Sequence, residues 1–174
     1  MGKKSIKTNK SIYQLSRESM NLTRAQASEG IVFMSESRIE KVENEKAPIH
    51  PEEVLAMSKV YRQPQLCNYY CSHECPIGVE FVPEVKIKDL SQIVLEMLAS
   101  INRLHKEKDR LIEITEDGII DDDELKDFAS IQDGLEKISI VADTLRLWID
   151  NTIVTGKIHK QRLLEIRENL KKTL

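Results

Sequence analysis

The sequence predicts an all-α protein, and three observations support that fold class. Only five of the 174 residues are prolines and six are glycines, and aromatic residues make up 5% of the chain. Residues 22–46 carry the start signals of two short helices joined by a turn, and an apolar heptad pattern begins after Asp89. Because helix breakers are few and helical signals recur, we expect helices along most of the chain.

The same signals divide the chain into four parts. Residues 1–10 form a basic tail, residues 11–64 a compact helical domain, residues 65–86 a cysteine-containing segment and linker, and residues 87–174 a second helical region. Proline and glycine residues make 65–86 too irregular for one long element.

The compact domain contains four predicted helices. The first covers 11–21, with Ile12, Leu15 and Met20 toward the core. The second opens at Thr23, which forms a capping-box pair with Gln26. The last covers 51–61 and begins with a proline in its first turn; its apolar face comprises Val54, Leu55, Met57, Ser58 and Tyr61.

The third helix is predicted over 35–44. Ser35 would cap the backbone amides at its start. Ile39 and Val42 would face inward, while the outer face carries Glu36, Ser37, Glu40 and Lys41.

These residues resemble the phage-repressor-like (Xre/Cro) helix-turn-helix family. The resemblance rests on Leu22-Thr23, the pattern Ser35-x-x-x-Ile39-x-x-Val42-Glu43-Asn44, Pro48 and the helix at 51–61, and it covers about residues 11–64. It implies a lambda-repressor-like fold and a sequence-specific transcriptional regulator. Helix 35–44 would lie in the major groove of double-stranded DNA, and the protein would act as a dimer.

The resemblance also implies which residues contact DNA. They lie at the start of the second helix, along the third and just beyond it: Thr23, Arg24, Ser35, Ser37, Arg38, Glu40, Lys41 and Lys46. The sequence departs from the family in having one extra residue between Ala27 and Ser35, a glutamate at 45 in place of glycine, and acidic residues on the DNA-facing side. Glu36, Glu40, Glu43 and Glu45 oppose a phosphate-facing role and favour an alternative, a protein-interaction module of the same fold that does not bind DNA.

The second helical region is predicted to contain a helical hairpin and a third helix over 157–172. One helix carries the apolar stripe Leu90, Val94, Met97, Ile101, Leu104 and Leu111, and the other carries Phe128, Ile131, Leu135, Ile138, Ala142, Leu145 and Ile149. Further apolar residues lie outside these stripes. The third helix would cover them in a monomeric bundle, a second chain would cover them in a homodimer, or a protein partner would dock there.

The cysteine residues are the only candidates for metal or redox chemistry. Cys67, Cys71 and Cys75 lie within nine residues together with His73, a ligand density suited to zinc or an iron–sulfur cluster. A cluster there would make the protein a metal-sensing or redox-sensing regulator. The alternatives are core packing, a disulfide and redox-active thiols.

Charge and the remaining motifs narrow the function classes. Residues 1–75 hold 11 Lys/Arg and 9 Asp/Glu, a net charge of +2, whereas residues 76–174 have a net charge of −5. Lys3, Lys4, Lys7 and Lys10 would form a DNA-contacting arm or a solvated tail. We expect a cytoplasmic protein because no membrane-spanning run or secretory signal is present. We expect no enzymatic activity because no phosphate loop, nucleophile elbow or HExxH motif occurs.

Overall fold

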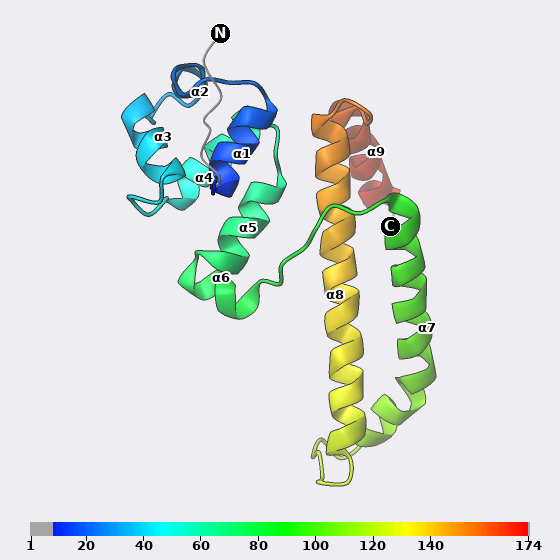
Figure 1. The fold of residues 1–174 in the computed structure, drawn as a ribbon. Helices are drawn as coiled ribbons and strands as arrows, with labels where there is room; N and C mark the ends of the chain where they lie inside the picture. Colours follow the sequence, from blue (N-terminus) through cyan, green and yellow to red (C-terminus); the bar gives the residue numbers. More distant parts are fainter. Residues whose placement is uncertain (1–8, 174) are drawn as a thin grey trace. The chain divides into compact units, whose positions relative to one another are not determined.

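The computed structural model describes residues 9–173, and within that range it contains nine helices and no strand (Figure 1). The all-α prediction is therefore confirmed. The described residues form two compact units, one of 9–84 with 149–173 and one of 85–148. The helices are α1 (Ile12–Ser19), α2 (Arg24–Gly30), α3 (Glu36–Glu43), α4 (Pro51–Val60), α5 (Gln65–His73), α6 (Pro76–Phe81), α7 (Leu90–Ile114), α8 (Leu125–Val154) and α9 (Lys160–Thr173).

The predicted helix starts of α2, α3 and α4 are confirmed. Thr23 and Gln26 form both hydrogen bonds of a capping box at α2, with the Gln26 backbone N–H 3.2 Å from Thr23 Oγ1. At α3 the Ser35 hydroxyl accepts from the Arg38 backbone N–H at 3.2 Å. Pro51 occupies the first turn of α4, where it has no intrahelical N–H to lose.

The helices α1, α3 and α4 each end at a residue with a left-handed backbone, and none of these residues is glycine. Asn21, Glu45 and Arg62 have φ angles of 55°, 56° and 53°. After α3 the Glu45 N–H donates to the Val42 carbonyl at 3.0 Å and the Lys46 N–H to the Lys41 carbonyl at 2.8 Å. These two bonds are those of a Schellman cap, so α3 ends in a left-handed cap although no glycine is present there.

One hydrophobic core joins α1–α5. It consists of Tyr13, Ala27, Ile31, Met34, Ile39, Val42, Ile49, Val54, Met57, Tyr61 and Leu66. The prediction that Leu15 faces this core is wrong, because its side chain is 52% exposed whereas Tyr13 and Arg17 are buried. Successive residues of a helix turn by about 100°, so a helix that directs Tyr13 and Arg17 inward directs Leu15 outward. Leu55 of α4 is exposed as well.

The core continues beyond residue 64 into α5. Leu66 is fully buried, and Cys67 and Tyr70 pack against the same cluster. The short helix α6 then crosses α5 at Gly78, where a Cβ atom would overlap the backbone carbonyl of Cys71. A glycine at 78 therefore permits the close approach of α6 to α5.

In the other unit α7 and α8 run antiparallel, joined by the turn over residues 115–124 (Figure 1). Arg103 pairs with Asp133 at 2.8 Å, and Arg110, farther along α7, pairs with Asp127, nearer the start of α8, at 2.7 Å. Ser130 also donates to Glu107 at 3.1 Å. These polar contacts connect the two helices in an antiparallel order.

The predicted apolar stripe of α7 does not match the buried face. Leu90, Val94 and Ile101 are 41%, 43% and 48% exposed, whereas Ile93 and Ile114 are completely buried. The face that α7 turns toward α8 also includes polar side chains, among them the half-buried Glu107, whose Oε1 accepts from Arg103 Nε at 3.3 Å and from the Ser130 hydroxyl at 3.1 Å. On α8 the predicted Leu135 is likewise exposed and Val141 is buried.

No helix within residues 9–173 is both long enough and apolar enough to cross a membrane.

Candidate nucleic-acid interface

The turn between α2 and α3 is anchored at its ends and has two outward side chains. Ile31 and Met34 are 1% exposed and anchor its ends in the core, whereas Val32 and Phe33 are 95% and 63% exposed. The Ser28 hydroxyl donates to the Met34 carbonyl at 2.7 Å, which ties α2 to the end of the turn. The turn is therefore held to the core at both ends and to α2 by a hydrogen bond.

A buried carboxylate holds α1, α2 and α3 together. Glu43 has no exposed surface, and its oxygens accept from Arg17 Nε at 2.5 Å, Arg17 Nη2 at 2.9 Å and Arg24 Nε at 2.8 Å. Burial lowers the pKa of the Arg17 guanidinium, but the hydrogen bonds to Glu43 and the negative charge of Glu43 raise it by more. The net shift is upward, so the guanidinium stays charged. Two arginines on different helices thus neutralise one acid on α3.

This role of Glu43 was not predicted from the sequence, where Glu43 was expected to be one of the acids that oppose DNA. Glu43 follows the inward-facing Ile39 by four residues and therefore shares its face. A buried position for an acid requires a buried cation nearby, and the arginines at 17 and 24 supply it.

Arg38 also has partners within the protein. Its Nε and Nη2 atoms donate to the two oxygens of Glu53, each at 2.7 Å, and Nη2 donates to the Pro48 carbonyl at 2.7 Å. Glu53 in turn accepts from the His50 backbone N–H at 2.9 Å. The predicted base-reading or phosphate-binding side chain thus links α3 to the start of α4.

The other predicted DNA-contact residues lie mainly at the outer surface. Ser35, Ser37, Glu40, Lys41 and Lys46 are exposed. Positions 37, 40 and 41 share one face of α3 because residues three and four apart lie on the same side of a helix. Thr23 is used as a cap, and Arg24 comes within 3.9 Å of Glu40. The start of α2 therefore borders the outer face of α3.

The cysteine residues lie apart from this surface, on and just after α5. All three are free thiols; Cys67 contacts the core, with its sulfur 3.4 Å from Ser58 Oγ. Burial and the neighbouring Cys75 and Cys67 raise the pKa of Cys71, which disfavours its thiolate.

The fourth predicted ligand, His73, packs against an aromatic ring. Its imidazole stacks on Tyr69 with ring centroids 4.5 Å apart, and Nδ1 lies 2.8 Å from Ser72 Oγ. Nowhere in residues 9–173 does the structure gather three His, Cys, Asp or Glu side chains as a ligand group. The zinc or iron–sulfur site at Cys67, Cys71, His73 and Cys75 stays a prediction.

Comparisons of the chain with protein-family models, with curated proteins and with solved structures find no match. The resemblance of residues 11–64 to the Xre/Cro family therefore rests on the residues that carry it.

Proposed function

We propose that this protein is a sequence-specific DNA-binding regulator that places α3 in the major groove. The observation that carries the proposal is the pairing of α2 and α3 around Glu43, which leaves Ser37, Glu40 and Lys41 on the outer face. A helix reads base edges only if its scaffold fixes its orientation. The Arg17–Glu43–Arg24 cluster supplies that fixation without using the outward side chains.

The groups available to DNA have distinct roles under this proposal. Lys41 and Ser37 would face base edges, while Lys46 and the backbone amides at the start of α2 would face phosphates. Arg38 would act indirectly, by holding α3 against α4 through Glu53. Of the basic tail, Lys3, Lys4 and Lys7 lie outside the described residues, and Lys10 pairs with Glu18 at 2.7 Å.

The second unit would supply dimerisation, because two half-sites require two copies of α3. Its hairpin exposes a set of large apolar side chains along α7: Leu90, Val94, Leu95, Leu98, Ile101 and Ile112. Clustered apolar side chains at the surface of a helix favour association. A second copy of the hairpin would cover them and pair two α3 helices.

Selection of genomic DNA fragments by the purified full-length protein, at two salt concentrations, tests the proposal. Recovery of a shared, roughly palindromic sequence at both concentrations is the expected result. Recovery of unrelated fragments that are lost at the higher salt concentration would instead indicate binding through charge alone.

A protein-interaction module is the second candidate, and a specific observation favours it. Arg24 and Arg38 are engaged in ion pairs with Glu43 and Glu53, while Glu36 and Glu40 are exposed on α3 and Val32 and Phe33 are exposed in the turn before it. Acidic and apolar groups suit a protein surface better than a phosphate backbone. Failure to select any DNA fragment would favour this candidate.

A further inference from the structure

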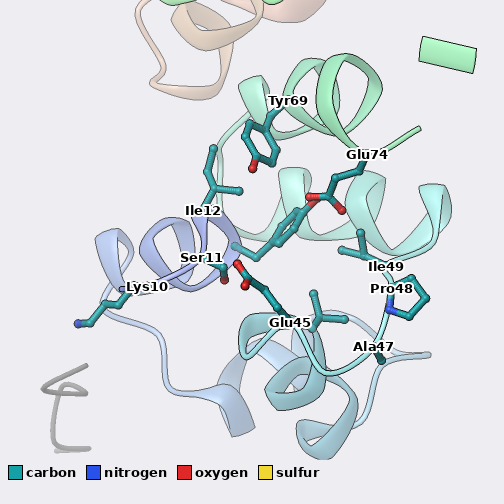
Figure 2. A pocket seen from close by; sticks show the side chains of 11 residues that line it. Lys10, Ser11, Ile12, Glu45, Ala47, Pro48, Ile49, Tyr69 and Glu74 are labelled. Carbon is teal, nitrogen blue, oxygen red and sulfur yellow. The ribbon is translucent and has the colours of Figure 1, made fainter. Parts of the chain in front are cut away.

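A cavity of about 480 Å³ opens between the start of α1, the segment after α3 and the end of α5 (Figure 2). Buried side chains of Tyr13, Val42 and Ile49 contribute to its lining, which also includes the ring of Tyr69. This volume falls within the range of small-molecule sites, which are commonly about 300–1,000 Å³. The cavity belongs wholly to residues 10–74 and is separate from the outer face of α3.

Two carboxylates reach the cavity from different elements. Glu45 follows α3 and Glu74 follows α5, and both are exposed (Figure 2). Within residues 9–173 neither is ion-paired with a lysine or arginine; Lys10, which also lines the cavity, pairs with Glu18. Glu74 accepts a hydrogen bond from the Tyr13 hydroxyl at 2.8 Å. The cavity thus carries an excess of negative charge.

The aromatic side chains that line the cavity lie close enough to these carboxylates to be affected by their charge. Burial, followed by the charges of Glu74, Glu45 and Glu84, raises the pKa of the Tyr69 phenol. Tyr69 and Tyr13 meet edge to face with centroids 6.3 Å apart, so two rings line one side of the cavity. Aromatic rings beside carboxylates favour cations over neutral or anionic molecules, since both attract positive charge.

We propose that this cavity binds a small organic cation, a primary ammonium or guanidinium group carried on a short apolar body. The cationic group would lie between Glu45 and Glu74, and the apolar body would pack on Tyr69, Ile49 and Val42. Either a free amine or the Lys or Arg side chain of another protein has this chemistry. The site does not depend on DNA binding.

Calorimetric titration of the full-length protein with benzylamine, and with benzyl alcohol as its neutral counterpart, tests the site. Saturable binding of benzylamine with one molecule per chain, about tenfold tighter than that of benzyl alcohol, is expected. Equal affinities for the two, or no saturation by benzylamine, would overturn the proposal.

The double variant Glu45→Gln/Glu74→Gln tests whether benzylamine binds in this cavity. It should weaken benzylamine binding by about tenfold or more and leave the melting temperature of the unliganded protein nearly unchanged, because a glutamine carbonyl still accepts from Tyr13. Glu52→Gln/Glu80→Gln is the matched control, since it removes two exposed charges that do not line the cavity. An equal loss of benzylamine affinity in both double variants would show that only the net charge of the protein matters, and it would refute the site.

A second titration separates the two sources of the cation. Butylguanidine represents a free guanidinium compound, and a blocked tripeptide with a central arginine represents a protein side chain of the same charge. Tighter binding of butylguanidine supports a metabolite site and tighter binding of the tripeptide supports a docking site, whereas binding of neither overturns the proposal.

Discussion

The Arg17 guanidinium and the Glu43 carboxylate form a two-point ion pair in the interior, with Nε–Oε1 and Nη2–Oε2 distances of 2.5 Å and 2.9 Å. Arg24 completes the neutralisation from α2. Because the three residues come from α1, α2 and α3, the pair specifies how these helices meet. A buried ion pair is not expected to stabilise the fold much more than an apolar contact would. Removing one partner, however, leaves the other as an unpaired buried charge, which destabilises the fold strongly.

Substitution of Glu43 by Gln should therefore destabilise the protein strongly. The neutral amide leaves the buried Arg17 without a counter-charge, and we expect a loss of about 3–5 kcal/mol in the free energy of unfolding. Urea denaturation followed by circular dichroism measures it. Glu40→Gln, at a side chain that is 53% exposed, is the control, with an expected change of about 0.5 kcal/mol or less. Similar small changes in both variants would show that the ion pair does not organise the helices.

Glu53 should make part of the stability depend on pH. Burial raises its pKa, but the hydrogen bonds from Arg38 and the His50 backbone, with the charge of Arg38, lower it more, so the net shift is downward. A lowered folded-state pKa stabilises the fold fully above the unfolded-state value, 4.5, and the contribution disappears as pH falls through the folded-state value.

The difference in unfolding free energy between wild type and Glu53→Gln reports that contribution. It should stay constant from about pH 7 to about pH 5.5 and shrink on further acidification. The same comparison with Glu52→Gln, which removes a neighbouring exposed acid, should show little change with pH. A wild-type advantage over Glu53→Gln that is as large at about pH 3 as at about pH 7 would contradict the assigned role.

Glu45→Gly should stabilise the protein, which is unusual for a substitution to glycine. The residue has a φ of 56°, a conformation that costs a side chain with a Cβ about 1–2 kcal/mol. Glycine relieves that cost but loses more backbone entropy on folding, so we expect a net gain of about 0.5–1 kcal/mol. Thermal unfolding detects it as a higher melting temperature. The control, Glu36→Gly within α3, should lower the melting temperature, and a lower value for both variants would rule out the left-handed cap.

Gly78→Ala should loosen the packing of α6 on α5. The new methyl group would meet the backbone carbonyl of Cys71, which cannot rotate away as a side chain can, and we expect a loss of about 1–3 kcal/mol. Gly134→Ala is the control, because its methyl group would lie 3.6 Å from the flexible end of Glu107. That change should instead add up to about 1 kcal/mol through helix propensity. Chemical denaturation of both proteins compares the two, and a harmless alanine at 78 would contradict the close approach.

Local signals in the sequence predicted the helices and their starts. Thr23, Ser35 and Pro51 act through hydrogen bonds or backbone geometry within a few residues, so their effects can be deduced without the tertiary structure. The end of α3 was harder to predict, because Glu45 adopts its left-handed conformation only with the support of the surrounding fold.

Long-range polar contacts could not be predicted in the same way. The apolar stripe of α7 was misplaced because the spacing of apolar residues takes no account of polar contacts such as that of the half-buried Glu107 with Ser130 of α8. At the proposed interface, Arg38 looked available to DNA because its partner Glu53 is 15 residues away. Glu43 looked like a surface acid for the same reason, since Arg17 lies 26 residues earlier in the chain.

The most direct test of DNA recognition by α3 is titration of the selected duplex with wild type, Lys41→Ala and Lys59→Ala. Lys59 is an exposed lysine of α4, so it controls for the loss of one charge. We predict that Lys41→Ala weakens binding by about 1–3 kcal/mol and reduces discrimination against a mismatched duplex, while Lys59→Ala binds nearly as wild type. Unchanged affinity and discrimination for Lys41→Ala would contradict the placement of α3 in the major groove.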